Sequence, residues 1–320
     1  MSLLELSHVS IGVKRGNETF TAVDDISFSI NEGEILGLVG ESGCGKSLTC
    51  LSIPGLLAPG LERLGGDICF KGRSIAALSP AELCRLRGKE ISMIFQEPAA
   101  SLNPLRRIGP QIAETLELHG MADKKKRRAE TLDIMGNLGL DEPEKLFRAY
   151  PHELSGGMCQ RVMIAIAAVC RPALLLADEP TTALDTAAQT QILELLRKIN
   201  RDFGAAILFV SHDLNLVNRV CGRALVMYAG KIVEAGNTAD IFSRPAHPYT
   251  QSLIGAIPRR EQKGKPLANI PGRVPPIEEP RRGCPFAPRC AYSEERCAAA
   301  FPAAADLEGG RRVYCVRHLR

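Results

Sequence analysis

The sequence has no apolar stretch long enough to cross a membrane and no recognisable leader. Its longest uninterrupted apolar run, Val162 to Cys170, is far short of the roughly 20 residues that a membrane-spanning helix needs. Residues 1–8 lack the basic start and the apolar core of a secretory signal peptide. We therefore expect a cytoplasmic chain, and any role at a membrane must come through a partner.

Cysteine is abundant for a chain expected in a reducing compartment, where structural disulfides are rare. Seven of the 11 cysteines are scattered between Cys44 and Cys221, and we interpret them as small hydrophobic residues. The other four crowd into the last 37 residues. Residues 251–320 also hold 13 Lys/Arg against 7 Asp/Glu, whereas the rest of the chain is slightly acidic. This asymmetry predicts a separate tail module.

A glycine-rich loop follows the apolar stretch Ile35–Val39, which reads as a buried strand. The loop matches the phosphate-binding P-loop pattern with Gly40, Glu41, Ser42, Gly43, Cys44, Gly45, Lys46 and Ser47, followed by Leu48. Glycines let backbone N–H groups turn toward phosphate oxygens, and the helix beginning near Lys46 adds the positive end of its dipole. Lys46 supplies a cation for the β- and γ-phosphates, and Ser47 a hydroxyl for Mg²⁺. A turn that binds nothing is the disfavoured alternative, because strand, loop, lysine and hydroxyl all stand in register.

Strands and helices alternate along most of the chain, which predicts an α/β fold with a mainly parallel sheet. We expect strands at 3–14, 19–30, 35–39, 66–72, 91–95, 173–177 and 205–210, and a hairpin at 224–234. We expect helices at 46–57, after Ser79, at 109–119, 124–138, 157–171 and 186–203, and up to Val220. Strand signals disappear from about 98 to 157, which predicts a helical insertion. Prolines beyond Ile257 mark a linker, so we expect a nucleotide-binding domain over 1–257 and a tail over 258–320.

Two acidic residues end the apolar strand Ala173–Ala177. The carboxyl ends of strands are where α/β folds bind ligands. Asp178 suits Mg²⁺, directly or through water, and Glu179 suits the polarisation of an attacking water as a general base. Alone, the pair could be an ordinary charged strand end. Behind a P-loop, it indicates a hydrolytic site.

A third motif, Leu154–Met158, opens an apolar helix. Ser155 is a natural N-cap, and Gly156 and Gly157 allow the backbone to come close to an anion. By themselves these residues would indicate only a helix start. The other motifs strengthen the functional interpretation, because all occur in one order within 173 residues: the P-loop, Gln96 after a strand, Leu154–Met158, Asp178-Glu179, Ala183-Leu184-Asp185 and His212.

With these motifs, the sequence resembles an ABC-type ATPase over about residues 3–250. The resemblance implies a P-loop core with an antiparallel β-subdomain at the N-terminus, ATP and Mg²⁺ as ligands, and two ATPase domains closing head to tail. Gln96 would link Mg²⁺ and the attacking water to a membrane partner, and His212 would contact the γ-phosphate. Ser155, Gly156 and Gly157 would cap ATP bound by the opposite subunit, where Asp185 also lies. Many members of this family have glutamine at the position where this chain has Met158. Phe20 is a candidate for stacking on adenine. An equally good interpretation is that Phe20 is a core residue of a strand.

Three segments are similar to those of dipeptide and oligopeptide importer ATPases: 96–104, His247-Pro-Tyr-Thr-Gln251 and the cysteine-rich tail. The related nickel and antimicrobial-peptide branches share them, so the substrate stays open. The resemblance implies a second ATPase, two permeases and a substrate-binding protein as partners. The second ATPase could be a copy of this chain or a paralogue, and the resemblance favours a paralogue. The chain would then lie on the cytoplasmic face of the cell membrane.

The four clustered cysteines are Cys284, Cys290, Cys297 and Cys315, separated by 5, 6 and 17 residues. Four thiols with few large apolar neighbours suggest a fold held by a metal. Zinc sites usually contain closer cysteine pairs, whereas four thiolates also suit an iron–sulfur cluster. Similar family tails favour a [4Fe–4S] cluster, with zinc and free thiols as alternatives.

Two other classes of protein fit the sequence less well. A soluble ABC-type ATPase acting on DNA or ribosomes usually carries two cassettes or a long coiled coil, and neither pattern is present. A P-loop GTPase would need a guanine-reading Asn-Lys-x-Asp motif, which the sequence lacks. The basic run Lys124–Arg128 reads as a solvated helix face, so we expect no nucleic-acid partner.

Overall fold

The computed structural model describes residues 2–319 except 183, 258–268 and 280–281. The chain divides into two compact units. The first contains Met1–Leu4, Ile30–Ile35 and Phe70–Val210, and the second contains Glu5–Ser29, Leu36–Cys69 and Ser211–Arg320. Because the chain passes between the units several times, neither unit corresponds to one continuous stretch of sequence.

The first unit is built on three parallel strands in the order β8-β7-β6. These strands are β6 (Ile91–Ile94), β7 (Leu174–Asp178) and β8 (Ala206–Ser211). Every residue of β7 is buried, which explains why its sequence is continuously apolar up to Asp178 rather than alternating. The short β5 (Arg73–Ser74) and a 3₁₀ turn (Ile75–Ala77) precede α2 (Pro80–Leu86). Ser79 caps α2 in a capping box with Glu82, as its sequence predicts.

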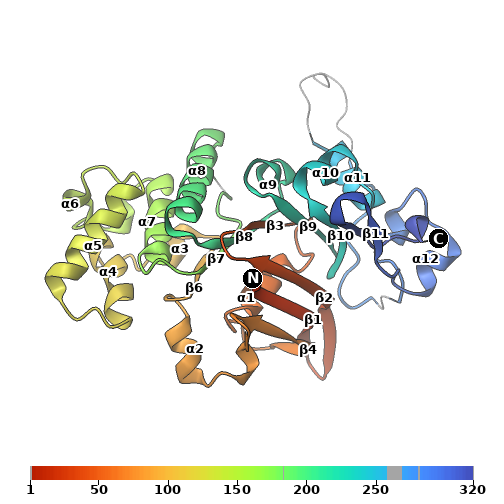
Figure 1. The fold of residues 1–320 in the computed structure, drawn as a ribbon, viewed down its shortest axis with the longest axis horizontal. Coiled ribbons are helices and arrows are strands. Elements are labelled where there is room, and N and C mark those ends of the chain that lie inside the picture. Colours follow the sequence, from red (N-terminus) through yellow and green to blue (C-terminus); the bar gives the residue numbers. More distant parts are fainter. Residues whose placement is uncertain (1, 183, 258–268, 280–281, 320) are drawn as a thin grey trace. The chain divides into compact units, whose positions relative to one another are not determined.

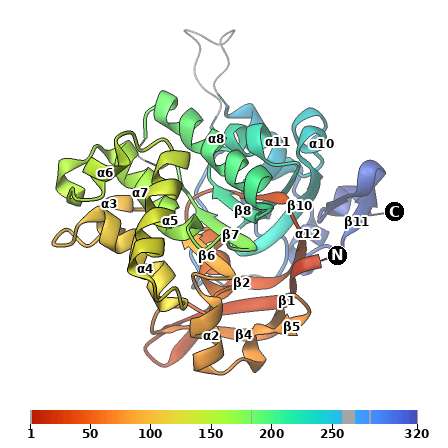
Figure 2. The ribbon, with the colours of Figure 1, turned by 60° about the vertical axis from the view of Figure 1, so that its left-hand side comes forward.

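The stretch expected to be helical consists of short helices that gather beside α7 (Figures 1 and 2). They are α3 (Pro98–Ser101), α4 (Ile108–Leu118), α5 (Lys124–Asn137) and α6 (Pro143–Leu146), followed by a 3₁₀ turn (Pro151–Glu153). Helix α7 (Gly156–Ala168) contacts α3, α4, α5 and β6. Helix α8 (Thr186–Phe203) has the bounds that the sequence predicts, because Asp185 caps its start and Gly204 adopts the left-handed conformation at its end.

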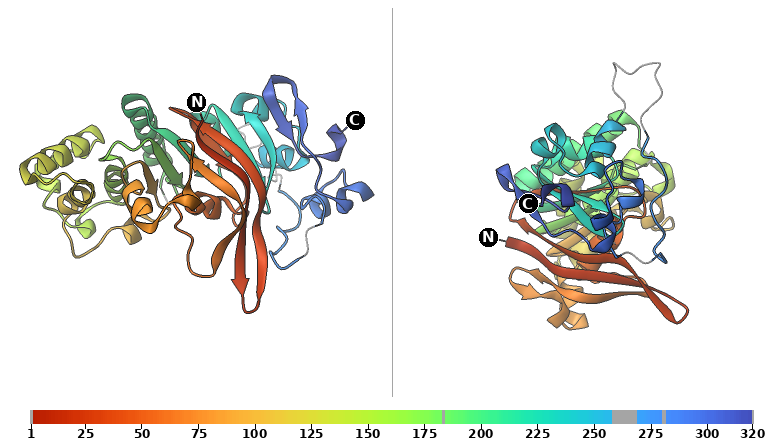
Figure 3. Two further views of the ribbon diagram at one scale, coloured as in Figure 1. Left: turned by 60° about the horizontal axis from the view of Figure 1, so that its bottom comes forward. Right: turned by 90° about the vertical axis from the view of Figure 1, so that its right-hand side faces the viewer.

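The second unit contains an antiparallel sheet with the strand order β2-β1-β4. Its long hairpin, drawn in red in Figure 3, joins β1 (Ser2–Arg15) to β2 (Glu18–Asn31). Strand β4 (Leu61–Phe70) begins five residues earlier than its sequence predicts. The alternation of buried residues along β1 and β2 places one face of each strand in the core.

Five further strands of this unit are hydrogen-bonded in the order β11-β12-β10-β9-β3. Strand β3 (Ile35–Val39) runs parallel to β9 (Arg223–Tyr228), and β9 forms the expected hairpin with β10 (Lys231–Asn237). Beyond β10 come β12 (Arg311–Val313) and β11 (Ala305–Leu307), both antiparallel. Val313 lies opposite Glu234 and is fully buried. The segment expected to form a separate tail therefore contributes two strands to this sheet.

The helices of the second unit are shorter and more numerous than the sequence suggests. They are α1 (Lys46–Ser52), α9 (Leu214–Val220), α10 (Thr238–Ser243), α11 (Pro248–Gly255) and α12 (Glu295–Ala299), with 3₁₀ turns at Ala287–Arg289, Glu308–Gly310 and Val316–His318. Helix α1 stops five residues before the expected end, and Gly55 just beyond it has a φ of 65°, a conformation that cannot continue a right-handed helix. Much of the expected linker, 258–268, lies outside the described residues. Within the described residues, no helix has the length and apolar character needed to traverse a bilayer.

Candidate nucleotide site

The P-loop connects β3 to α1 in the second unit, and two of its glycines are required by their surroundings. A Cβ at Gly40 would lie 2.1 Å from the carbonyl oxygen of Met227, which no side chain could accommodate without a backbone shift. Gly45 has a φ of 105°, and a Cβ there would lie 2.9 Å from Val23 and from Met227. Close packing against β9 and the start of β2 therefore fixes the path of the loop.

The lysine of the loop is buried within the curve of its own backbone. The Nζ atom of Lys46 donates hydrogen bonds to the carbonyl oxygens of Gly40, at 2.8 Å, and Glu41, at 3.0 Å. It also lies 3.9 Å from the Sγ atom of Cys44. Burial raises the pKa of the Cys44 thiol, and the nearby Lys46 only partly opposes this effect, so the thiol stays neutral. The ammonium thus sits where the loop's N–H groups would surround phosphate oxygens.

Ser42 and Gly43 are exposed, and Gly43 has a φ of 78°. Ser47 and Leu48 are half-buried in the first turn of α1.

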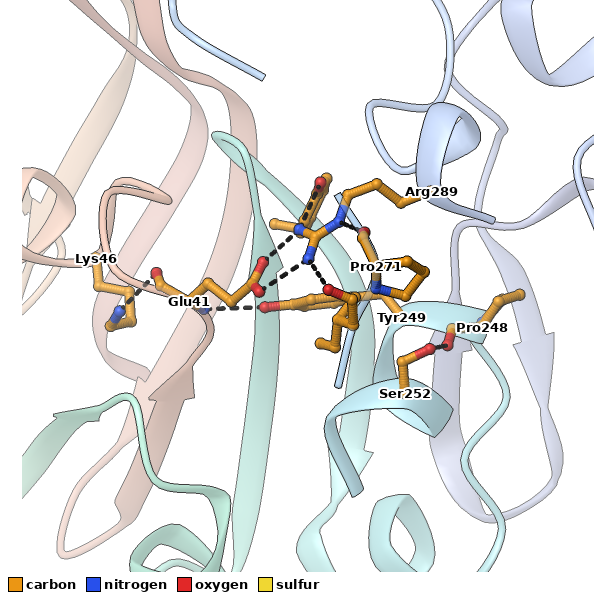
Figure 4. Close-up of polar contacts among 9 residues, drawn as sticks. Glu41, Lys46, Pro248, Tyr249, Ser252, Pro271 and Arg289 are labelled. Carbon is orange, nitrogen blue, oxygen red and sulfur yellow. Dashed lines mark hydrogen bonds and ion pairs between the residues drawn. The ribbon is translucent and has the colours of Figure 1, made fainter. Parts of the chain in front are cut away.

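Two residues near the loop were missed by sequence reasoning. The phenol oxygen of Tyr249, in α11, accepts a hydrogen bond from the N–H of Glu41 at 2.9 Å. The guanidinium of Arg289 pairs with the Glu41 carboxylate at 2.7 Å (Figure 4). Burial raises the pKa of Tyr249 far above its usual range, so its hydroxyl remains protonated. Both residues belong to segments noted above as family-like, and no local signal assigns either one to the P-loop.

Phe20 is half-buried on β2 rather than in the core. It lines a cavity of about 370 Å³ together with Asp24, Lys231, Glu278 and Phe301 among others. The neighbouring backbone is tied to the P-loop, because the N–H of Gly230 donates to the carbonyl of Cys44 at 2.9 Å. A cavity that combines an aromatic ring with polar side chains suits a nucleoside.

The paired carboxylates end β7 in the first unit, and both are largely buried. Glu179 has a φ of 45°, a conformation that costs about 1 kcal/mol or more for a residue with a side chain and is typical of functional sites. Its Oε2 accepts hydrogen bonds from Thr182 at 3.0 Å and from the amide of Gln96 at 3.3 Å. The structure therefore brings Gln96 and Glu179 together, and Asp178 directly precedes Glu179 in the sequence.

The Ser155 motif also lies in the first unit. Ser155 caps α7, and its hydroxyl accepts a hydrogen bond from the N–H of Met158 at 3.3 Å. A Cβ at Gly156 or Gly157 would meet no described atom within 4 Å outside the adjacent residues and the backbone of its own helix, so packing against the rest of the described chain does not require either glycine. Asp185 caps α8 through the N–H of Ala188 at 2.8 Å, and Ala183 of the same motif lies outside the described residues.

His212 follows β8 and is exposed, and it belongs to the second unit with the P-loop. The next residue, Asp213, caps α9 through the N–H of Asn215 at 2.8 Å. The cap allows α9 to begin directly after the strand, so His212 lies at the carboxyl end of β8.

The four clustered cysteines, all in the second unit, line one small pocket: Cys284, Cys290, Cys297 and Cys315. Burial raises the pKa of Cys284 to about 11 and also raises the pKa values of Cys290 and Cys315. The donor set of four thiols fits a metal centre chemically. The pocket of about 10 Å³ has room for about one water, and within the described residues no three His, Cys, Asp or Glu side chains have metal-binding geometry. A metal would therefore require these side chains to turn.

Comparison with known proteins agrees with the motifs. Residues 23–182 match the family described as "ABC transporter", and residues 233–297 match "Oligopeptide/dipeptide transporter, C-terminal region". The oligopeptide transport ATP-binding protein OppD of Escherichia coli (strain K12) is 44% identical over 316 residues, covering 99% of this chain and 93% of that protein. The dipeptide transport ATP-binding protein DppD of the same organism is 43% identical, covering 98% and 96%.

The fold has a solved counterpart. A dimeric ATP-binding cassette, MJ0796, in a post-hydrolysis state bound to ADP and Pi, superimposes with a TM-score of 0.66 at 29% identity. The match covers 73% of this chain and 98% of that one. Both the family match and the near-full-length relatives lead to one conclusion: the chain belongs to the ABC transporter family.

Proposed function

We propose that this chain hydrolyses ATP to power the import of dipeptides or oligopeptides. Membership of the family makes it an ATPase. We infer the substrate class from the match of residues 233–297 to the C-terminal region of oligopeptide/dipeptide transporters. The relatives at 43–44% identity are named for peptide transport and cover nearly the whole chain.

The chemistry of the site residues supports specific roles. The P-loop N–H groups and Lys46 would hold the phosphates, and Phe20 would stack on the base. Ser47, Asp178 and Gln96 supply the hard oxygen donors that Mg²⁺ prefers. Glu179 would polarise the attacking water, with Thr182 and Gln96 fixing its carboxylate. His212 would contact the γ-phosphate.

A second ATPase subunit would complete the site from outside. We assign this role to Ser155, Gly156, Gly157 and Asp185. The space beside the two glycines supports it, because no described atom beyond their own helix would lie within 4 Å of an added Cβ. The partner would be a paralogue, and two permeases and a substrate-binding protein would complete the importer. The chain would then be peripheral on the cytoplasmic face of the membrane.

The four clustered cysteines would hold a [4Fe–4S] cluster, which would support the tail module rather than take part in hydrolysis.

Substitution of Glu179 tests the catalytic assignment. Glu179→Gln removes the base but keeps the size of the side chain, so steady-state ATP hydrolysis should fall at least about a hundredfold while ATP binding persists. The measurement is phosphate release by the complex of the chain with its partners, alongside equilibrium ATP binding. Glu194→Gln, an exposed carboxylate on α8 paired with Arg197, is the matched control and should keep full activity. Near-wild-type turnover by Glu179→Gln would remove Glu179 from the mechanism.

A further inference from the structure

The guanidinium of Arg289 is buried and uses all of its donors. Its Nη1 lies 2.7 Å from Oε2 of Glu41 and 3.2 Å from the hydroxyl of Tyr228. Its Nη2 lies 3.2 Å from Oε1 of Glu41 and 3.1 Å from the carbonyl of Ile270, and its Nε donates to the carbonyl of Pro271 at 2.7 Å. Five N–H groups thus have five acceptors, and the carboxylate is held at both oxygens. Only 5% of the Arg289 side chain is exposed.

Glu41 is held from three directions. Its carboxylate is paired with Arg289, its N–H donates to Tyr249, and its carbonyl accepts from Lys46 (Figure 4). Both its peptide groups and its side chain are therefore fixed by residues outside the loop or by the loop's own lysine. Since Glu41 directly follows Gly40, these contacts set the direction in which the first N–H groups of the P-loop point.

An aromatic cluster supports the arginine. The rings of Tyr228 and Tyr249 lie 4.5 Å apart, and Phe286 packs against them at 5.2 Å and 5.4 Å. Phe286 is almost fully buried and stands three residues before Arg289, at the 3₁₀ turn Ala287–Arg289. The same turn connects Cys284 to Cys290. The cysteine-rich segment is therefore anchored beside the P-loop by one buried ring and one buried charge.

The charge of Glu41 matters for an anion site. An unpaired carboxylate in a phosphate-binding loop would repel the nucleotide, and the repulsion would be strong in a partly buried position. Arg289, which lies 248 positions away in sequence, neutralises this carboxylate through two hydrogen bonds. The pair thus removes a repulsive charge and fixes the loop in one arrangement.

We propose that Arg289 is a positioning residue for ATP binding: through Glu41 it holds the P-loop in its phosphate-binding form, so the cysteine-rich segment is part of the nucleotide site. This rests on the proposed role of the P-loop in ATP binding. Arg289 touches neither phosphate nor water in this scheme and acts only through Glu41. Its loss should therefore change the affinity for ATP more than the rate of hydrolysis at saturating ATP.

The test compares three variants: Arg289→Gln, Glu41→Gln and the double variant. Arg289→Gln leaves the Glu41 carboxylate without its counter-charge, and the Kd for the fluorescent probe mant-ATP should rise about tenfold or more. The double variant removes both charges and replaces them with two amides, so most of the lost affinity should return. In the assembled complex, KM for ATP should follow the Kd, while kcat should change by less than about twofold. Arg296→Gln, an exposed arginine of the same segment paired with Glu294, is the matched control.

Each outcome has a defined meaning. Unchanged affinity in Arg289→Gln would overturn the proposal while leaving the ATPase assignment intact, provided that the wild-type chain binds mant-ATP. A wild-type chain that fails to bind mant-ATP would instead contradict the proposed function. The proposal would also be overturned if the double variant did not recover the lost affinity and if Tm dropped equally in the single and the double variant. That result would show a merely structural role for Arg289. If Arg289→Gln does not fold, Arg289→Lys keeps the charge but loses the two-pronged contact, and it should show an intermediate loss of affinity.

Discussion

At the scale of single residues, Ser155 shows how one side chain can have a local and a longer-range role. Its hydroxyl caps α7, yet the residue itself is exposed, as is Gly156 after it. An N-cap contributes about 1 kcal/mol to stability, so a serine here is explained by the helix alone. The adjacent glycines are not explained in this way, because a Cβ at either would meet no described atom within 4 Å and glycine weakens a helix. Their presence supports an approaching partner.

Ser155→Arg tests that role. The bulky cation should block the approach of a second subunit, so ATP hydrolysis by the assembled complex should fall at least about tenfold. ATP binding by the isolated chain should be unchanged. Ser155→Ala is the control, since it removes the same cap without adding bulk and should lower stability by ~1 kcal/mol. Loss of ATP binding by the isolated Ser155→Arg chain would contradict the assignment to a site completed by the partner.

The same scale shows which site residues the sequence could and could not reveal. Lys46 and Glu179 follow buried strands in recognisable patterns, so their placement could be predicted from neighbouring residues. Tyr249 and Arg289 act on Glu41 across 208 and 248 residues of sequence. Nothing in their local sequence encodes that contact, because it depends on how distant strands and turns pack in the fold.

At the scale of elements, the segment containing the four cysteines is tied together by its backbone and its rings. The N–H of Cys284 donates to the carbonyl of Cys297 at 2.7 Å, which joins the first turn to α12. Arg317 lies over the ring of Tyr292 at 3.9 Å, and both side chains line the cysteine pocket. This arrangement explains how the four thiols come to surround one pocket despite spacings unlike those of common zinc sites.

Metal analysis tests the cluster. Protein purified without oxygen should be brown and contain about four irons and four acid-labile sulfides per chain. Cys297→Ser should deplete both, because Cys297 is a proposed ligand, whereas Cys84→Ser, an exposed cysteine elsewhere, should deplete neither. Colourless protein with one zinc per chain would favour the alternative metal. Metal-free protein with an unchanged Tm would exclude both.

Element boundaries show where sequence patterns lose information. The bounds of α8 agree with the sequence because both of its ends carry capping residues. Strands β11 and β12 have three residues each, too short for alternation to emerge from their sequence. Their identity as strands depends on the exposed edge of β10, which pairs with β12. Such short elements form because a partner edge is available, so they could not be predicted from local sequence.

At the scale of the whole molecule, the proposed site residues divide between the two units. The P-loop, Phe20 and His212 belong to the second unit, and the hydrolytic and partner-facing residues belong to the first. The second unit also contains the carboxy-terminal segment, which contributes two strands and two buried arginines. One of them, Arg311, lies 3.9 Å from the carboxylate of Glu234, which is completely buried and accepts hydrogen bonds from the N–H groups of Ala246 and His247. The tail is thus integrated into the core of this unit.

Deletion of residues 258–320 should therefore destabilise the chain rather than leave an independent ATPase domain. The deletion would expose the edge of β10, a known cause of aggregation, and would remove the counter-charges of Glu234 and Glu41. Breaking one buried ion pair typically costs about 3–5 kcal/mol, a large share of the stability of a domain. Size-exclusion chromatography should show aggregates, and thermal unfolding should begin at a lower temperature than in the full chain.

Two substitutions in β12 separate the contribution of this strand from that of the rest of the tail. Val313→Asp should reproduce part of the loss of stability because the side chain of Val313 is buried, whereas Arg312→Ser, at an exposed position of the same strand, should not. The carboxy-terminal strands would be dispensable if the truncated chain were monomeric, as stable as the full chain, and bound ATP with the same affinity.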